Sequence, residues 1–416
     1  MPTVSVIVVS NGRPDALQRC LLGLSQIDHP ACEVIVVADA ISWPAIAASG
    51  LGHAIKTVDF DRPNISAARN AGLAVAAGDV VAFIDDDAVP EPTWLSHLTA
   101  PFADETVTAT GGFVRARNGI AFQWRARLAF QDAQTTPIAV DAVRPTLIAA
   151  GPGRAVKTEG TNMAVRRQAM IAMGAFDEAF AFYLDETDIN LRLAAQRATT
   201  AIVPLAQVHH GFAPSVRRRA DRVPRTLFEI GASLAVFLRK HGQTSHPTPH
   251  VHRAHQRRRL LAHMVAGRMM PGDVGRLLRT FDAGWADGLR RQTGQYPAFP
   301  SPVSDFVPFP TRIRPHRVIW SGVLNRRLAS ADAARAVAEG CVVSLFILSP
   351  TALFHRSAFT SAGLWRQTGG QFGKSDRDDP VWRSWHRKAR VTRELARVRM
   401  VRVPGGAVSE NSPETA

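Results

Sequence analysis

The sequence predicts an α/β protein whose first half is built on a mostly parallel sheet. Two observations carry this prediction. Apolar runs of strand length alternate with stretches of helical composition from residue 3 to residue 85, and a run of three aspartates directly follows the third apolar run, in "FIDDDAVPEPTWL". In open α/β sheets, ligands bind beyond the carboxyl ends of the strands, so these acids mark a candidate site.

The first elements follow one another in a β-α-β rhythm. We expect a strand at "TVSVIVVS" (3–10), an amphipathic helix at "RPDALQRCLLGLSQ" (13–26) with Pro14 near its start, and a buried strand at "EVIVVADA" (33–40). "NISAARNAGLAVAAGD" (64–79) predicts a helix with Gly78 as its C-cap, and "VVAFI" (80–84) a third buried strand.

Composition changes along the rest of the chain suggest further regions. After a first domain over 1–215, residues 216–295 read as a basic helical region, and the prolines of 296–315 indicate a linker. Residues 316–400 predict a small C-terminal α/β segment of unknown role, with strands at 316–323 and 341–350 and a helix at 331–340. We expect 401–416 to be a disordered tail.

Bulk composition limits the cellular setting and the partners. The chain has 416 residues, is 46% hydrophobic and has a net charge of +15, so it can bury a sizeable core. Its three cysteines form no metal motif, which fits a reducing compartment. The N-terminal apolar run is too short for a signal peptide, and no segment is long enough to span a membrane. We therefore expect a cytoplasmic protein.

Basic clusters lie at 215–228 and 252–260, where they could meet phosphate, an anionic membrane or nucleic acid. The segment "RTLFEIGASLAVFLRKH" (225–241) has a helical apolar period and basic ends. We hypothesise that it rests on the inner face of the cell membrane.

The aspartates at 85–87 need compensation, because close carboxylates raise one another's pKa unless a cation or hydrogen-bond donors offset their repulsion. The three aspartates could form a turn that is simply exposed to water. Alternatively, they could bind a metal ion or a nucleotide, since hard divalent cations prefer carboxylate oxygens.

Two more polar groups follow. In "FYLDETDINLRLAAQ" (182–196), Asp185 can cap a helix, Asp188 can pair with Arg192 on the surface, and Glu186 should point inward as a candidate general base. In "AIVPLAQVHHGFAPS" (201–215), a histidine pair, His209 and His210, follows a strand.

Three blocks together resemble glycosyltransferase family 2, which has the GT-A fold. They are "VSVIVVSNGRPDALQRCLLGL", "ISAARNAGLAVAAGDVVAFIDDDAVPEPTWL" and the run from "GTNMAVRR" through "GAFDEAF" and "YLDETDINLRL" to "IVPLAQVHH". Their order and spacing are those of the family over residues 3–215. The resemblance implies a GT-A domain with a Rossmann-like mixed sheet, and an inverting transfer of sugar from a nucleotide diphosphate to a hydroxyl of a glycan or glycolipid, in cell-envelope or exopolysaccharide synthesis.

The resemblance also implies roles for single residues. Asp87 and His210, with Asp85, would hold a Mg²⁺ or Mn²⁺ ion. The base would be Glu186, with Asp188 and Asp185 as neighbouring acids. The donor, which we expect to be a UDP-sugar, would contact Ser10, Asp39, Arg69, Asp85 and Asp86. The polar turn Gly160, Thr161 and Asn162 would face the acceptor. The partners would be this donor, a glycan or lipid-linked acceptor, and the membrane surface, with no nucleic acid.

Two alternatives compete. "FIDDDAV" also fits a haloacid-dehalogenase-type phosphatase with Asp85 as nucleophile, for which Lys374, Asp378 and Asp379 could supply the remaining groups. A non-enzymatic basic scaffold that binds membrane or nucleic acid would explain the arginine clusters. The phosphatase pattern leaves the "ARNAG" and "DETD" blocks unexplained, and the sequence shows no recognition helix, RNA-binding aromatic motif or zinc spacing for a nucleic-acid scaffold.

Overall fold

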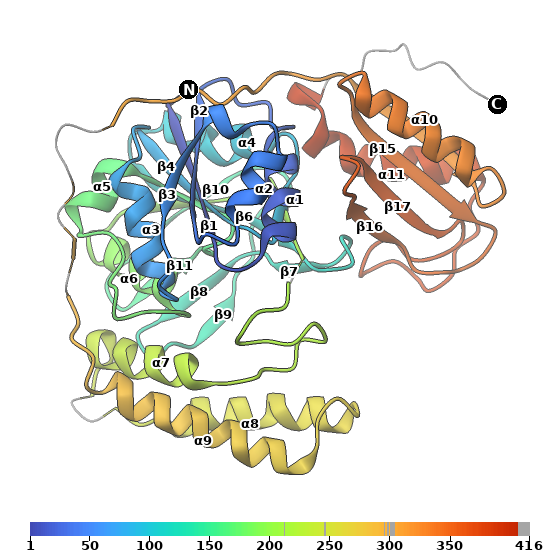
Figure 1. Cartoon of the computed structure of the whole chain (residues 1–416). Coiled ribbons are helices and arrows are strands. Elements are labelled where there is room, and N and C mark those ends of the chain that lie inside the picture. The colour runs from blue at the N-terminus through green and yellow to red at the C-terminus, as the bar shows by residue number, and fades with distance from the viewer. Residues whose placement is uncertain (212, 245–246, 295, 298, 300–303, 407–416) are drawn as a thin grey trace.

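The computed structural model describes residues 1–211, 213–244, 247–294, 296–297, 299 and 304–406. A large α/β domain occupies the centre, a helical region lies along one side of it, and a smaller α/β unit lies at one end (Figure 1). Among the described residues, no helix is both long and apolar enough to cross a membrane.

A ten-stranded mixed sheet forms the large domain. Its main path runs β10-β13-β6-β12-β4-β1-β2-β3. The strands along this path are β10 (Thr146–Ala149), β13 (Thr199–His210), β6 (Val107–Arg115), β12 (Met163–Arg166), β4 (Val80–Asp85), β1 (Val4–Ser10), β2 (Cys32–Ala38) and β3 (Ile55–Asp59). Strands β4, β1, β2 and β3 are parallel, as the sequence indicated, whereas β12 is antiparallel to both β4 and β6. Two short strands, β5 (Ala88–Pro90) and β7 (Phe122–Trp124), pair with β13 and β6.

Helices cover both faces of this sheet because the strand side chains alternate in direction. Val4, Val6 and Val8 of β1 share a core with α1 (Pro14–Leu24), while Ile7 belongs to the core on the other face. The other helices of the domain are α2 (Trp43–Ala48), α3 (Ile65–Ala74), α4 (Trp94–Thr99), α5 (Arg167–Ala172) and α6 (Asp185–Ala195). A small sheet, β11-β8-β9, is made of β8 (Arg127–Phe130), β9 (Thr135–Pro137) and β11 (Arg154–Lys157).

The C-cap prediction at Gly78 is wrong, because α3 ends at Ala74 and Val75 is its cap. Gly78 lies against β1 instead. A Cβ atom at this position would come within 2.6 Å of the backbone nitrogen of Ser5. The glycine therefore permits a close backbone approach and does not end the helix.

The helical region consists of α7 (Phe228–His241), α8 (His250–Val265) and α9 (Pro271–Gly288). Its core depends on close approach of α7 and α9, since a Cβ at Gly284 would lie 1.9 Å from the Phe228 carbonyl. Residues 231–238 of α7 are buried, and Leu234–Leu238 belong to the core cluster that contains Phe180 and Phe281. The hypothesis that the apolar face of 225–241 rests on a membrane is therefore wrong: protein already covers that face.

The described part of the proline-rich segment, 304–315, has no helix or strand and runs along the large domain. Phe309 is buried, and its backbone nitrogen donates to the Cys32 carbonyl. Val307 donates its backbone N–H to Glu33. The segment is thus fixed on the domain surface by these contacts.

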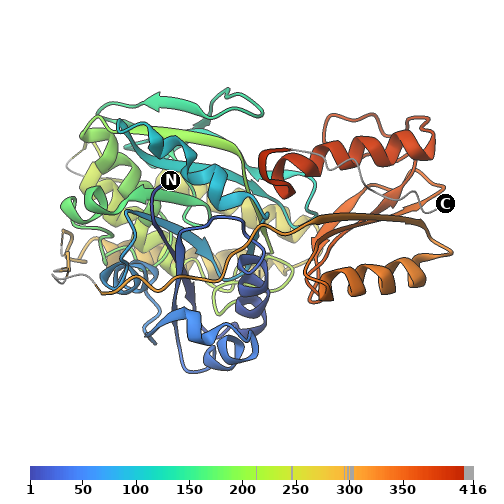
Figure 2. The ribbon, with the colours of Figure 1, turned by 90° about the horizontal axis from the view of Figure 1, so that it is seen from above.

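The C-terminal unit is a four-stranded sheet in the order β14-β15-β17-β16, with α10 and α11 beside it (Figure 2). Its elements are β14 (His316–Gly322), α10 (Arg326–Ala338), β15 (Val342–Ser349), β16 (Arg356–Phe359), β17 (Trp365–Gly370) and α11 (Arg387–Arg402). We expected a disordered tail to begin at residue 401. Helix α11 instead continues to Arg402, and both Val401 and Arg402 are buried. Residues 407–416 lie outside the described part.

A buried ion pair joins this unit to the large domain. Arg402 donates through Nε and Nη2 to Glu91, at 2.8 and 3.0 Å, and both side chains are almost fully buried. His209 of β13 also contacts Glu91, at 2.8 Å, and packs on the ring of Trp365. Burial by itself raises the pKa of Glu91, but Arg402 and His209 outweigh it and lower that pKa to about 2.

Replacing Arg402 with leucine should destabilise the protein by about 3–5 kcal/mol, because Glu91 would remain buried without its guanidinium partner. Arg335→Leu, which removes an exposed pair with Asp332, is the matched control and should cost less than about 1 kcal/mol. Urea unfolding of the three proteins measures both effects. Equal, small losses would contradict a structural role for the buried pair.

Candidate donor and catalytic site

Acidic side chains collect at the carboxyl edge of the parallel strands. In the register of β1 and β4, Val9 pairs with Asp85, and Ser10 pairs with Ala38 of β2. The strands therefore end level with one another, and the residues that follow them share one edge. Asp39, just after β2, accepts hydrogen bonds from the Gly12 backbone at 2.8 Å and the Ser42 hydroxyl at 2.6 Å.

The three consecutive aspartates have different environments. Asp85 is the most open, with 29% of its side chain exposed. Asp86 is fully buried and is held by Ser10 Oγ at 2.7 Å and Arg13 at 2.6 Å. Burial raises its pKa to about 7 in spite of Arg13. The hydrogen bond between Ser10 and Asp86 therefore joins the end of β1 to the segment that follows β4.

Asp87 is kept ionised. Burial works to raise its pKa, but the hydrogen bond from His210 and the charges of His210 and Arg13 lower it well below the ordinary range. One carboxylate oxygen lies 3.1 Å from His210 Nε2, and the other accepts the Ala213 backbone N–H at 2.7 Å.

Asp85, Asp87 and His210 form a cluster that suits a cation. One ligand atom from each lies within 4.8 Å of the other two. Two carboxylates and an imidazole are an appropriate donor set for Mg²⁺ or Mn²⁺. The sequence placed His210 after a strand, whereas the structure makes it the last residue of β13, which brings it to Asp87.

Arg69 connects this cluster to the second acidic group. Its side chain is 5% exposed and forms ion pairs with Asp185 and, at 3.3 Å, with Asp85. A third contact, at 3.1 Å, goes to the Gly160 carbonyl. Burial raises the pKa of Asp185 to about 8, with Arg69 opposing the rise. Arg69 therefore joins the strand β4 edge to the N-terminus of α6.

Glu186 lies next to Asp185 and is 13% exposed. Its carboxylate accepts from Lys157 Nζ at 2.8 Å, and the same ammonium group binds Glu159 at 2.6 Å. Burial raises the pKa of Glu186, but Lys157 outweighs burial and lowers the value to about 2. Glu186 is thus an ionised carboxylate beside the acidic edge.

Asp188 has a different place. The predicted pairing with Arg192 is confirmed, at 2.8 Å, but the pair is not on the surface because Asp188 is fully buried. Lys240 and His241 of α7 also bind its carboxylate, at 2.8 and 2.7 Å. Asp188 therefore fastens α6 to the helical region.

The turn 160–162 packs against Arg69 and forms buried hydrogen bonds below the site. A Cβ at Gly160 would lie 2.5 Å from Arg69, so glycine leaves room for the guanidinium. Asn162 is fully buried; its amide donates to the Phe113 and Ala206 carbonyls and accepts from Trp94. Thr161 is also buried, and its hydroxyl finds no partner among the described residues.

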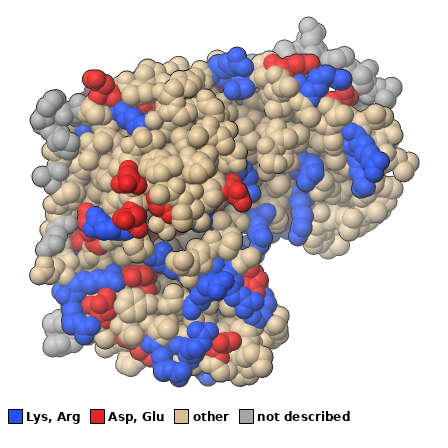
Figure 3. All heavy atoms as spheres, viewed as in Figure 1, with Lys and Arg blue, Asp and Glu red and all other residues tan. Residues whose placement is uncertain are grey.

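Four charged groups of this site were not assigned to it from the sequence: Arg13, Lys157, Glu159 and Arg218. Arg218 lies in the basic cluster 215–228, for which phosphate was one of the expected partners. Arg13 follows β1 and lies 3.6 Å from Asp87, so the carboxyl-edge argument could have found it. Arg218 reaches to 4.0 Å from the same carboxylate. Figure 3 shows Lys and Arg side chains gathered on the lower part of this face, over the helical region, and along the notch between that region and the C-terminal unit.

Comparisons with known proteins show which family the large domain resembles. Residues 5–178 match the model of glycosyl transferase family 2. The O-antigen biosynthesis protein RfbC of Myxococcus xanthus is 26% identical over 246 residues, which cover 54% of this chain and 18% of RfbC. The pre-mycofactocin glycosyltransferase of Mycobacterium tuberculosis is 25% identical over 253 residues, which cover 58% of this chain and 49% of the relative. The matched regions thus span about half or less of these relatives.

Solved structures align with this chain at lower sequence identity. A mannosyltransferase from Pyrobaculum calidifontis, in complex with GDP-Man and Mn²⁺, aligns with a TM-score of 0.44 and 18% identity over 70% of this chain and 87% of its own. GalNAc-T7 with UDP, GalNAc and Mn²⁺ aligns with a TM-score of 0.41 and 16% identity, over 57% and 48% of the two chains.

The family match spans the β-α-β units, the triplet and the turn at 160–162, and it favours a glycosyltransferase over a non-enzymatic scaffold. It also favours a glycosyltransferase over the phosphatase alternative. Asp379, offered there as a catalytic acid, lies in the C-terminal unit and is occupied by Arg393 and two backbone N–H groups. Residues 5–178, which form most of a mixed α/β sheet with helices on both faces, are therefore similar to glycosyl transferase family 2.

Proposed function

We propose that this enzyme is an inverting, metal-dependent glycosyltransferase that moves a sugar from a nucleotide diphosphate, with UDP as the expected nucleotide, to a hydroxyl of a glycan or lipid-linked acceptor. The cluster of Asp85, Asp87 and His210 carries the proposal. Arg69 connects Asp85 of this cluster to Asp185, the residue before Glu186. The name of the relative RfbC, an O-antigen biosynthesis protein, supports a role in cell-envelope or exopolysaccharide synthesis.

In the donor site, Asp87, His210 and Asp85 would hold Mg²⁺ or Mn²⁺, which neutralises charge on the departing nucleoside diphosphate. Arg13 and Arg218, both near Asp87, add positive charge on the side where the diphosphate would lie. Asp39 orders the loop after β1 through Gly12. We propose that this loop and Asp85 bind the nucleoside.

In the acceptor site, Glu186 is the proposed general base. It would take the proton from the acceptor hydroxyl as that oxygen attacks the anomeric carbon from the face opposite the leaving group, which inverts the configuration. Asp185 holds Arg69, and Asp188 holds α6 on α7, so both position the base and do not themselves react. The turn at 160–162 supports Arg69 from behind.

Replacing Asp87 with alanine should abolish metal-dependent nucleotide binding. Calorimetric titration with UDP, GDP and dTDP, with and without Mn²⁺, measures it. Wild type should bind one nucleotide at least about tenfold more tightly with the metal, since cation and diphosphate neutralise one another. Metal-independent binding that survives Asp87→Ala would contradict the proposed metal site.

Glu186→Gln tests the proposed general base, and Asp188→Asn tests the residue that holds α6 against α7. Glu186→Gln should retain donor binding and thermal stability and lose about 10²–10⁴-fold in transfer rate, the usual contribution of a general base. Asp188→Asn should lower the unfolding temperature, because it weakens contacts to Lys240, His241 and Arg192. The assignment fails if Glu186→Gln keeps full transfer activity.

Replacing Lys157 with methionine should raise the pKa of Glu186, because the ammonium group that lowers it is removed. A base with a raised pKa is protonated at higher pH, so the acidic limb of the pH–rate profile should move upward. Lys157→Arg keeps the charge and is the control. An acidic limb that stays in place in Lys157→Met would show that Glu186 is not the titrating base.

A further inference from the structure

The C-terminal unit exposes an unusual set of large apolar side chains at one end. Of its nine exposed large apolar residues among those described, seven lie in the three segments that follow β14, β15 and β17. Leu324 is 97% exposed, and Phe354 and Trp382 are each 60% exposed. The seven residues are Val323, Leu324, Leu328, Leu353, Phe354, Val381 and Trp382; we call this set the apolar tip.

These segments meet in space because β14, β15 and β17 are adjacent and parallel, so their carboxyl ends form one edge of the sheet. That edge points away from the large domain. In both views, the chain enters the unit beside the large domain and β14 runs outward to the far end, from which α10 returns (Figures 1 and 2). The apolar tip is therefore at the outer end of the molecule.

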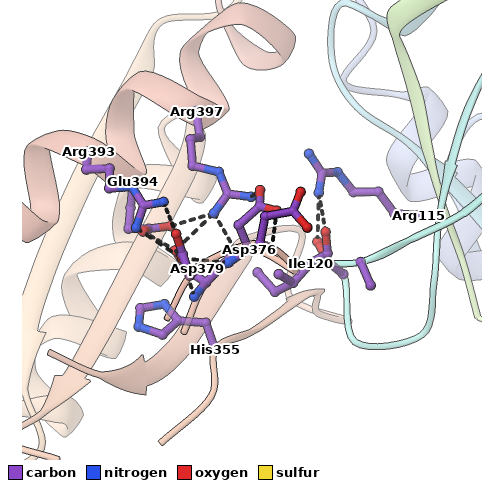
Figure 4. Close-up of polar contacts among 12 residues, drawn as sticks. Arg115, Ile120, His355, Asp376, Asp379, Arg393, Glu394 and Arg397 are labelled. Atoms are coloured by element: carbon purple, nitrogen blue, oxygen red, sulfur yellow. Dashed lines mark hydrogen bonds and ion pairs between the residues drawn. The ribbon is translucent and has the colours of Figure 1, made fainter. Parts of the chain in front are cut away.

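Basic residues surround the apolar tip. Residues 323–328, 350–356 and 371–388 contain eight Lys or Arg and three Asp. Two of those aspartates are paired with helix α11: Asp379 binds Arg393, and Asp376 binds Arg397 at 3.1 Å (Figure 4). The positive charge on exposed residues such as Arg326, Arg327 and Arg383 thus dominates this end.

The segment that carries Trp382 is held in a fixed shape. The carboxylate of Asp379 accepts from the backbone nitrogens of Ser375 and Asp376 at 3.0 and 2.8 Å. The Ser375 hydroxyl donates to the buried Glu394 at 2.6 Å, and Gln371 donates to the Trp385 carbonyl at 2.6 Å. The fold therefore fixes the segment around the exposed Val381 and Trp382, so little further ordering is needed for contact.

We propose that the apolar tip and its basic surround form the docking surface of this enzyme on an anionic membrane. Apolar and aromatic side chains enter the interface between headgroups and acyl chains, and Lys and Arg contact anionic headgroups. A second copy of the same surface would be repelled by its positive charge, which favours lipid as the partner. The docking surface itself does not depend on the proposed function. Its role, which is to bring the enzyme to a lipid-linked acceptor, rests on that proposed function.

Co-sedimentation with vesicles tests the docking surface without any substrate. Wild type should bind vesicles containing phosphatidylglycerol and bind pure phosphatidylcholine at least about tenfold more weakly, and binding should fall with added salt. Leu324→Gln with Trp382→Gln, and separately Arg326→Glu with Arg327→Glu, should each reduce binding to the anionic vesicles by about tenfold.

Matched substitutions on the helical region are the controls. Val265→Gln with Met270→Gln removes equally exposed apolar groups, and Arg257→Glu with Arg258→Glu makes the same charge change on α8. Both should bind vesicles like wild type. Equal losses from the control pairs, or concentration-dependent dimers abolished by Leu324→Gln with Trp382→Gln, would overturn the proposal.

Nucleotide titration of the same variants keeps this test separate from the proposed function. The tip variants should unfold at the wild-type temperature and bind nucleotide and Mn²⁺ like wild type, because they lie outside the donor site. Vesicle binding with no nucleotide binding by any of the proteins would leave the docking surface standing and remove the donor-site proposal.

Discussion

The structure depends on compensation of the carboxylates that crowd one edge of the central sheet. Asp86 is held by Arg13, Asp87 by His210, Asp185 by Arg69 and Glu186 by Lys157. Buried carboxylates without such partners would be protonated or would destabilise the fold. The pairing leaves Asp85, the most open of the three aspartates, next to Asp87 and His210, which is where a cation can bind.

Parts of the chain outside the family match hold this edge in place. Helix α7 supplies Lys240 and His241 to Asp188, which fixes the helix that carries Glu186. Helix α11 supplies Arg402 to Glu91, which also binds His209, the neighbour of His210. The helical region and the C-terminal unit are therefore structural supports of the site in addition to any surface that they offer to partners.

The sequence predicted the elements of the first domain well because their signals are local. Buried strands such as Val80–Asp85 are continuous apolar runs, and Pro14 marks the start of α1. Long-range partners were not predictable. Nothing local shows that Asp188 is buried by α7, or that the apolar face of α7 packs on α9. Helix α11 was missed because its many arginines obscure the apolar period, and its burial depends on Glu91 far away in sequence.

The proposed enzyme binds its nucleotide at the acidic edge through a cation. The most direct measurement is anomalous X-ray diffraction from crystals grown with MnCl₂ and the nucleoside diphosphate that binds. We expect an anomalous peak between Asp85, Asp87 and His210, at a position that also contacts the diphosphate. A bound nucleotide with no manganese peak there, or a peak at another group of carboxylates, would contradict it.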